Sequence, residues 1–299
     1  MNADNTLFIS NEFLRAGIST LGAELISLTD DGAGREYIWQ RGPSVWNRSA
    51  PLLFPVIGRL RDGRYTHRGA EYLMGRHGFA RDSAFTLLET RGGMAAFRLT
   101  DTPASREVYP FSFEFTVSYE LRGYSLIKEQ RVENRSGETM YYELGGHDGF
   151  LLPEEMEHCA LSFPGLDRLT LLRGGGEIEL TCGALPLDTE LFRDGALLMR
   201  TPENGVSLSC GAQRRVSLSS AEFPYLALWT PYPAGKRLLC LEPWTTVPDG
   251  GDTPFELADK PDILSLRPGA SRTHRYTITL EETCREKYSR ETKEASAAA

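Results

Sequence analysis

Strict two-residue alternation is the feature that most limits how this chain can fold. Phe111, Phe113, Phe115, Val117, Tyr119 and Leu121 alternate with Ser112, Glu114, Thr116, Ser118 and Glu120. Successive side chains of a strand point to opposite faces, so this run predicts a strand with one apolar face and one solvent-exposed face. Such alternation is typical of antiparallel sheets. Residues 275–281 repeat it, and so do residues 206–210 and 216–219, whose short connection predicts a hairpin.

Further short strands are expected throughout, separated by Gly, Pro, Asn and Asp clusters, and almost no long helical pattern is present. Many short strands predict an all-β sandwich or barrel. We expect one domain over residues 1–282, and a frayed helix or disordered tail over residues 283–299. The expected strands are residues 7–10, 23–28, 36–40, 85–89, 95–99, 126–132, 141–144, 160–163, 196–199, 225–229 and 238–242.

Charge and cysteine usage narrow the class of protein. The net charge of −8 lacks the basic excess of proteins that bind nucleic acids or anionic membranes, so neither partner is expected. The five cysteines are odd in number and form no CxxC pair, which predicts reduced thiols and a cytoplasmic protein. No signal peptide and no apolar run long enough for a membrane span are recognised.

The segment 51–82 predicts one wall of a polar site. It contains two Pro, five Gly, two His and six Arg, a mixture unsuited to a helix or a core strand. Loops on a rigid scaffold often carry binding groups. Arg59, His77 and Arg81 are its candidate site residues, and a solvated basic loop is the alternative.

Two later segments carry further ionisable residues. In Glu143-Leu-Gly-Gly-His147-Asp148, a strand ends at two glycines before His147, which can then point into a cleft or cap a turn. In Leu239-Cys-Leu-Glu242-Pro-Trp, the carboxylate follows an apolar run and precedes Pro. A carboxylate there is either paired or functional, because burying it alone is costly.

These residues favour proton transfer on a sugar over other chemistry. His77, His147 and Glu242 could form a two-His, one-carboxylate metal set, but no pair has a short ligand spacing, so we expect no metal. The sequence contains no GxSxG elbow, no Walker motif and no GxGxxG after a strand. One carboxylate and two His among aromatic residues suit a site that binds sugar hydroxyls and transfers protons.

The chain resembles the aldose 1-epimerase (galactose mutarotase-like) family, especially its LacX-like branch. The resemblance spans roughly residues 8–280. It rests on five blocks: residues 51–59 (PLLFPVIGR), 76–82 (RHGFARD), Asn134-Arg-Ser with Gly145-Gly-His147, 191–194 (LFRD) and 240–244 (CLEPW). It implies a large antiparallel β-sandwich, called a supersandwich, with the sugar in a cleft over one sheet.

The resemblance also implies a reaction, the interconversion of the α and β anomers of a free aldose without a cofactor. Glu242 corresponds to the catalytic base, and His147 to the general acid that protonates the ring oxygen. His77 and Arg59 correspond to residues that orient sugar hydroxyls. We expect the proximity of the pair to favour ionised Glu242 and protonated His147.

Two departures from the family pattern leave the substrate open. A substrate-binding Asp of galactose mutarotases is absent from residues 225–231, where Trp229 is expected to line the pocket instead. Asp148 stands where relatives often have Pro, and it is expected to orient His147 or to contact sugar.

The alternatives are a carbohydrate-binding or sensing protein with little catalysis, a hexose-6-phosphate mutarotase in which Arg76 and Arg81 hold the phosphate, and a glycoside hydrolase or lyase. The hydrolase or lyase is disfavoured because Glu242 lacks a convincing second catalytic carboxylate. The expected partner is a small aldose, and the expected state is a monomer or homodimer.

Overall fold

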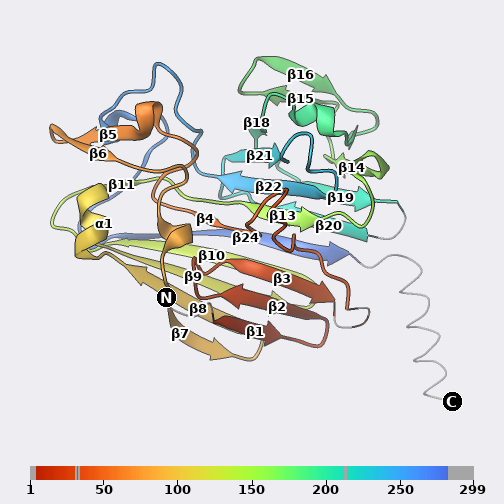
Figure 1. Cartoon of the computed structure of the whole chain (residues 1–299), viewed down its shortest axis with the longest axis horizontal. Helices are drawn as coiled ribbons and strands as arrows, with labels where there is room; N and C mark the ends of the chain where they lie inside the picture. The colour runs from red at the N-terminus through yellow and green to blue at the C-terminus, as the bar shows by residue number, and fades with distance from the viewer. Residues whose placement is uncertain (1–4, 31, 33, 212–213, 282–299) are drawn as a thin grey trace.

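A nine-stranded antiparallel sheet forms one layer of the molecule in the computed structural model (Figure 1). The structure describes residues 5–30, 32, 34–211 and 214–281; the predicted tail, residues 283–299, lies outside this part. In spatial order the strands are β17 (Ala184–Pro186), β14 (Cys159–Ser162), β19 (Val206–Cys210), β20 (Arg214–Ser219), β24 (Ser271–Glu281), β10 (Ser125–Asn134), β9 (Phe113–Arg122), β8 (Met94–Thr100) and β7 (Thr86–Arg91).

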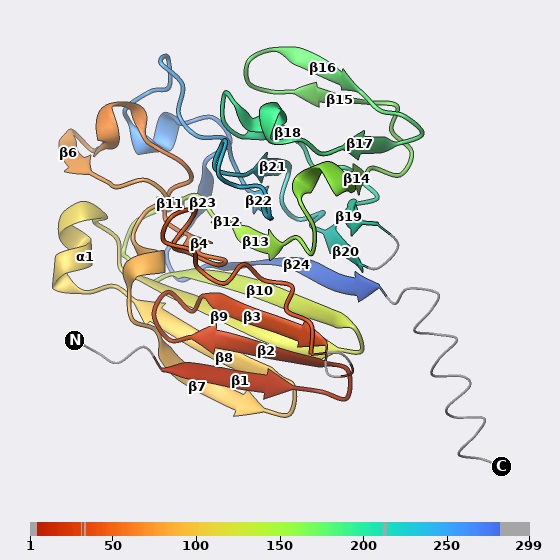
Figure 2. The same ribbon diagram turned by 45° about the vertical axis from the view of Figure 1, so that its right-hand side comes forward.

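A second layer covers this sheet (Figure 2). Its six-stranded part contains β18 (Leu197–Arg200), β21 (Tyr225–Trp229), β22 (Leu238–Trp244), β12 (Gly145–Gly146), β4 (Leu52–Leu53) and β13 (Asp148–Leu151), which pairs with β22. Its three-stranded part contains β1 (Thr6–Ser10), β2 (Leu14–Ser19) and β3 (Leu25–Asp30). Tyr119 of β9 donates a 2.6 Å hydrogen bond to the Ala23 carbonyl, which joins the layers.

Smaller elements surround the two layers. Three two-stranded sheets pair β5 (Arg64–His67) with β6 (Ala70–Leu73), β11 (Met140–Tyr142) with β23 (Leu264–Leu266), and β15 (Arg168–Leu171) with β16 (Gly176–Glu179). The helix α1 (Pro103–Val108) begins at a Thr102 cap. Short 3₁₀ turns occupy Arg61–Gly63, Ala80–Asp82, Met156–His158, Thr189–Phe192 and Leu257–Asp259. The predicted all-β sandwich is therefore confirmed.

The alternating sequence runs form the core as predicted. In β9 every second residue from Phe113 to Leu121 is buried, and β24 and the β19–β20 hairpin repeat the pattern. The neighbouring strand β10 differs, because its buried face includes Lys128 and Gln130 beside Leu126 and Val132. A fully buried lysine in a sheet core requires a partner.

The partner of Lys128 is Asp148, which the other layer supplies. Lys128 Nζ lies 3.2 Å from Asp148 Oδ1, and Tyr276 of β24 donates a hydrogen bond to the other carboxylate oxygen. Both charged side chains are completely buried. This group of three polar residues joins β10, β24 and β13 across the interior of the sandwich.

Two expectations for local structure are wrong. Residues 36–40 form no strand and make only isolated bridges, through Glu36 and Ile38. The segment 51–82 includes β4 and the β5–β6 hairpin besides loops. Its Gly and Arg content indicated the loops but not the hairpin, whose second strand, β6, is exposed at three of its four positions and shows no alternation.

The expectation of reduced cysteines is also wrong. Cys159 and Cys210 form a disulfide across β14 and β19, where they lie directly opposite each other in register. They are 51 residues apart in sequence, and spacing alone could not reveal that register. Cys182 and Cys240 are free thiols.

Removing the charge of Lys128 should destabilise the fold strongly. Lys128→Met leaves the Asp148 carboxylate buried without its cation, and we expect the free energy of unfolding to fall by about 3–5 kcal/mol. The double variant Lys128→Met with Asp148→Asn removes both charges and should recover most of this loss. Urea unfolding of the three proteins measures the effect; equal losses in the single and double variants would contradict the charge argument.

Candidate active site

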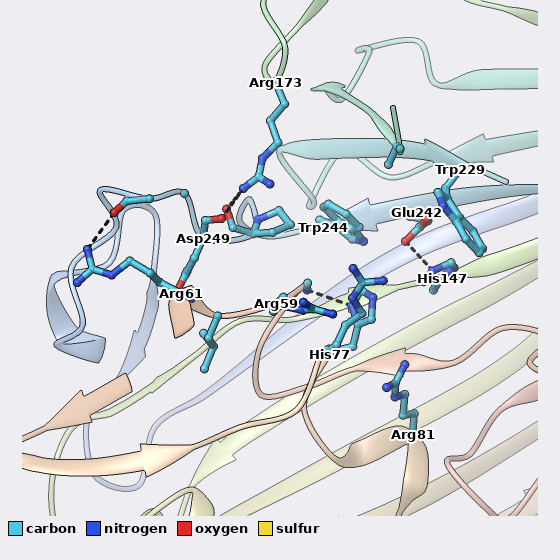
Figure 3. Close-up of a pocket in the computed structure, with 18 of the residues that line it drawn as sticks. Arg59, Arg61, His77, Arg81, His147, Arg173, Trp229, Glu242, Trp244 and Asp249 are labelled. Carbon is cyan, nitrogen blue, oxygen red and sulfur yellow. Dashed lines mark hydrogen bonds and ion pairs between the residues drawn. The ribbon is translucent and has the colours of Figure 1, made fainter. Parts of the chain in front are cut away.

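Strand register brings His147 and Glu242 together. Gly145 pairs with Trp244 and Asp148 with Leu241, so His147 lies directly opposite Glu242 between β12, β13 and β22. Because side chains alternate, His147 and Glu242 share the face of this sheet that is turned away from the nine-stranded layer. Asp148 faces that layer instead. The pair lines a cleft of about 510 Å³ (Figure 3).

The pair is in direct contact and almost fully buried. His147 Nε2 lies 3.3 Å from Glu242 Oε2, and the two residues are 7% and 1% exposed. Burial raises the pKa of Glu242 well above its ordinary value, and the neighbouring Asp148 adds to this effect. Burial lowers the pKa of His147 well below its ordinary value, and the positive charge of Arg81 acts in the same direction.

These shifts correct the expectation of a charged pair. Desolvation opposes charge on both groups and outweighs their mutual attraction, so the free protein favours a neutral carboxyl and a neutral imidazole. The neutral and charged forms of the pair contain the same number of protons. They differ only in whether the shared proton lies on Glu242 or on His147.

Glycine allows aromatic rings to approach the pair. A Cβ on Gly149 would lie 2.7 Å from Trp46 Cζ3, so only glycine admits the indole at this position. The Trp46 ring stacks on His147 with 4.9 Å between centroids, and Trp229 meets the same imidazole edge-on at 5.5 Å. The two indoles give the cleft an apolar side next to the acid–base pair.

His77 is held by strained backbone as a neutral hydrogen-bond donor. The Gly58 N–H donates to His77 Nδ1 at 3.0 Å, which leaves the proton on Nε2. Burial, with Arg81 and Arg76 nearby, lowers the pKa of His77 to about 3. His77 has a φ of +65°, and a Cβ on the following Gly78 would lie 2.2 Å from the Phe54 carbonyl oxygen.

A buried ionic network holds the opposite wall. Lys260 Nζ lies 2.5 Å from Glu143 and 2.8 Å from Asp249. Glu143 also accepts the Ile57 N–H at 2.6 Å, and Asp249 accepts the Arg61 N–H at 2.8 Å. Lys260 therefore ties the loop before His77 to the loop after Trp244.

Five arginines line the cleft: Arg59, Arg61, Arg76, Arg81 and Arg173. Three of them already have partners. Arg61 packs on Phe255 and donates to the Gly251 carbonyl, Arg173 donates to the carbonyls of residues 248 and 249, and Arg81 pairs with Asp82. Arg59 and Arg76 have no hydrogen bond or ion pair with any described residue.

Six of the seven predicted site residues line this one cleft: Arg59, His77, Arg81, His147, Trp229 and Glu242. Asp148 does not line it, and the expectation that Asp148 contacts sugar is wrong. Its side chain is fully buried between the sheets with Lys128 and Tyr276, because consecutive strand residues face opposite ways. Sequence reasoning missed Trp46 and Arg173; a Trp just after the turn residues Gly42-Pro43-Ser44 was the available signal for Trp46.

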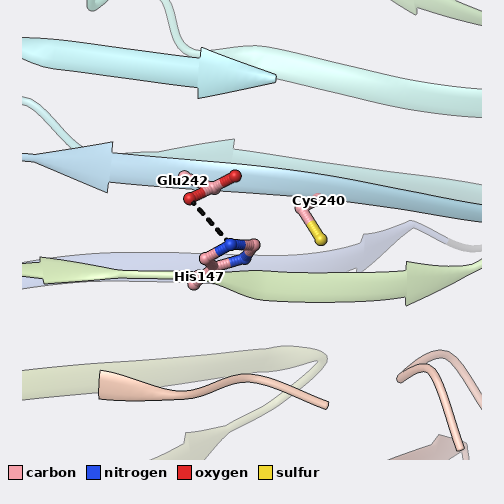
Figure 4. Close-up of side chains that lie close together, drawn as sticks. All are labelled: His147, Cys240 and Glu242. Atoms are coloured by element: carbon pink, nitrogen blue, oxygen red, sulfur yellow. Dashed lines mark ion pairs between the residues drawn. The ribbon is translucent and has the colours of Figure 1, made fainter. Parts of the chain in front are cut away.

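A metal-ligand set other than the one considered from sequence lies beside the cleft. His147, Cys240 and Glu242 each offer a ligand atom, and these atoms all lie within 4.8 Å of one another (Figure 4). All three residues are buried. His77 is not part of this set, although its ring lies 5.5 Å from that of His147.

No helix in the described part of the chain is both long and apolar enough to cross a membrane.

The sequence and fold match known proteins. The family model for aldose 1-epimerase matches residues 6–198. The protein LacX encoded on a plasmid of Lactococcus lactis subsp. lactis is 32% identical, over 92% of this chain and 99% of its own length. A galactose mutarotase related enzyme from Lactobacillus acidophilus is 32% identical, with a TM-score of 0.87, over 93% of this chain and 98% of its own.

A galactose mutarotase-like protein from Lactobacillus casei has a TM-score of 0.86 at 26% identity, over 93% of this chain and 100% of its own. The match of the family model, the LacX relatives and the shared architecture agree with one another. The chain belongs to the aldose 1-epimerase family.

Proposed function

We propose that this protein is an aldose 1-epimerase that interconverts the α and β anomers of an aldose. The observation that carries the proposal is the buried contact between His147 and Glu242 at the floor of an open cleft. Opening a hemiacetal ring requires removal of one proton and delivery of another, and a positioned pair typically contributes about 10²–10⁴-fold. The reaction requires no cofactor.

The proposed mechanism begins with the proton that Glu242 and His147 share. Its transfer from Glu242 to His147 gives a carboxylate beside an imidazolium. Glu242 then takes the proton of the anomeric hydroxyl, and His147 gives its proton to the ring oxygen. The C1–O5 bond breaks while the C1–O1 double bond forms. Rotation about C1–C2 and the reverse transfers close the ring on the other face.

Burial favours the neutral form of the pair at both ends of the ring-opening step. After ring opening Glu242 carries a proton and His147 is neutral, which is the form that desolvation stabilises. The neutral pair therefore accompanies the open-chain sugar. The resting protein contains the same neutral pair, so burial makes the charged pair a transient state between the two neutral ones.

The surrounding side chains have complementary proposed roles. His77 Nε2–H and the Arg59 guanidinium donate hydrogen bonds to sugar hydroxyls. The indoles of Trp46 and Trp229 pack on C–H faces of the sugar. Lys260 keeps the two opposing loops at a fixed separation through Glu143 and Asp249.

Glu242→Gln and His147→Asn should each nearly abolish catalysed anomer exchange, because each removes one proton-transfer group. Polarimetry of freshly dissolved α-glucose and α-galactose measures the rate, with exposed Glu222→Gln as the matched control. Wild-type rates in both active-site variants would overturn the mechanism. Saturable sugar binding without acceleration by the wild-type protein would favour the alternative, a carbohydrate-binding protein.

A second candidate, a hexose-6-phosphate mutarotase, is favoured by the two arginines without partners. Arg59 and Arg76 add positive charge to a cleft whose carboxylates are the buried Glu242 and the Lys260-paired Asp249. The charge of Arg76 also acts on His77, His147 and Glu242. Guanidinium groups bind phosphate well because they present several donors in one plane.

If the substrate is phosphorylated, kcat/KM should be at least about tenfold higher for glucose 6-phosphate than for glucose. Magnetisation exchange between the anomers, measured by NMR, gives both values. Arg76→Gln should bring their ratio toward one, whereas Arg91→Gln, exposed on β7, should leave it unchanged. Equal kcat/KM values for the two sugars in the wild-type protein would exclude the phosphate candidate.

A further inference from the structure

We propose that His147, Cys240 and Glu242 form a binding site for a thiophilic divalent cation, of the class of Zn²⁺ and Cd²⁺, which blocks the acid–base pair when bound. This inference adds a ligand that the proposed reaction does not use. Its inhibitory part rests on the proposed function, and its binding part does not.

Strand geometry brings the third ligand to the pair. Cys240 precedes Glu242 by two residues on β22, so both side chains lie on the same face. Cys240 pairs with Gly149 of β13. Because glycine has no side chain, no group of this β13 residue covers the thiol. Figure 4 shows the Glu242 carboxylate above the imidazole of His147 and the Cys240 sulfur beside that ring.

The three side chains have unused capacity for a ligand. Cys240 is a free thiol and is fully buried. Among the described residues, His147 Nδ1 has no hydrogen-bond partner. Glu242 Oε2 faces His147 Nε2 at 3.3 Å, so both atoms of this contact belong to candidate ligands. Buried polar atoms without partners are rare and indicate a site that can accept an additional group.

The ligand types select the cation. Sulfur, imidazole nitrogen and carboxylate oxygen together suit Zn²⁺ and related soft or borderline ions, whereas Mg²⁺ and Ca²⁺ prefer oxygen ligands. Ligand atoms on one tetrahedral zinc lie about 3.5 Å apart, so the set, now within 4.8 Å, requires side-chain movements of only about 1 Å. The cleft leaves a fourth position for water.

Binding of the cation exchanges protons of the ligands for the metal ion. Two protons leave to solvent as the ligands bind the metal, the Sγ–H proton of Cys240 and the proton shared by Glu242 and His147, and no electron is transferred. Glu242 and His147 then direct their lone pairs to the cation and can no longer accept or deliver the protons of the sugar. A bound cation and a reacting sugar therefore exclude each other at this pair.

A single-thiol background tests the site directly. In the Cys182→Ser, Cys284→Ser parent, Cys240 is the one cysteine outside the disulfide. We expect Cd²⁺ to bind this parent with one-to-one stoichiometry by calorimetry and to produce the ultraviolet charge-transfer band of a cadmium–thiolate bond. Adding Cys240→Ser should remove the band and weaken binding by about tenfold or more. His147→Asn should weaken binding while the band persists.

The same proteins separate the two parts of the inference. In an active parent, Zn²⁺ should stop anomer exchange, EDTA should restore it, and Cys240→Ser should raise the inhibitory concentration about tenfold. Failure of all exchange without metal would refute the proposed function but leave the cadmium band as a test of the site. Unchanged cadmium affinity in the Cys240→Ser protein, with its fold verified by circular dichroism, would overturn the inference.

Discussion

The alternation of side chains at His147 and Asp148 links the active site to the interior of the sandwich. Consecutive residues of an extended segment face opposite ways, so His147 points into the cleft whereas Asp148 points into the interior of the sandwich. Asp148 joins Lys128 and Tyr276 in the interior, which ties the two layers together. His147 meets Glu242 on the other face, at the floor of the cleft. A slip of one residue in this register would exchange the two roles.

Burial then determines the electrostatics of the cleft. The acid–base pair is almost inaccessible, so desolvation favours its neutral form although the two groups touch. His77 is likewise kept neutral and presents a donor from a strained loop. The charge of the cleft comes mainly from arginines, of which Arg59 and Arg76 have no partner among the described residues. The site therefore combines a neutral reactive centre with a cationic rim, within a chain whose net charge is −8.

Sequence patterns predicted the parts of this structure that depend on local periodicity. The alternation from Phe113 to Leu121 predicted strand β9. The turn residues near His147 and Glu242 indicated a polar site, and both residues line one cleft. Contacts that depend on the register between strands far apart in the sequence could not be predicted. The Cys159–Cys210 disulfide arises from such a register, and so does the burial of Asp148 against Lys128. The charged side chain in the apolar pattern of β10 was the one local sign of that buried pair.

We infer that a neutral His147–Glu242 pair shares one proton at the floor of the cleft. The most direct test is ¹⁵N NMR of the His147 imidazole across pH. Because burial lowers the pKa of His147, we predict a neutral ring as the pH falls through the ordinary value of 6.5, with protonation only well below it. Protonation with a midpoint at or above 6.5 would contradict a neutral pair, because the charged form would then prevail in the free protein.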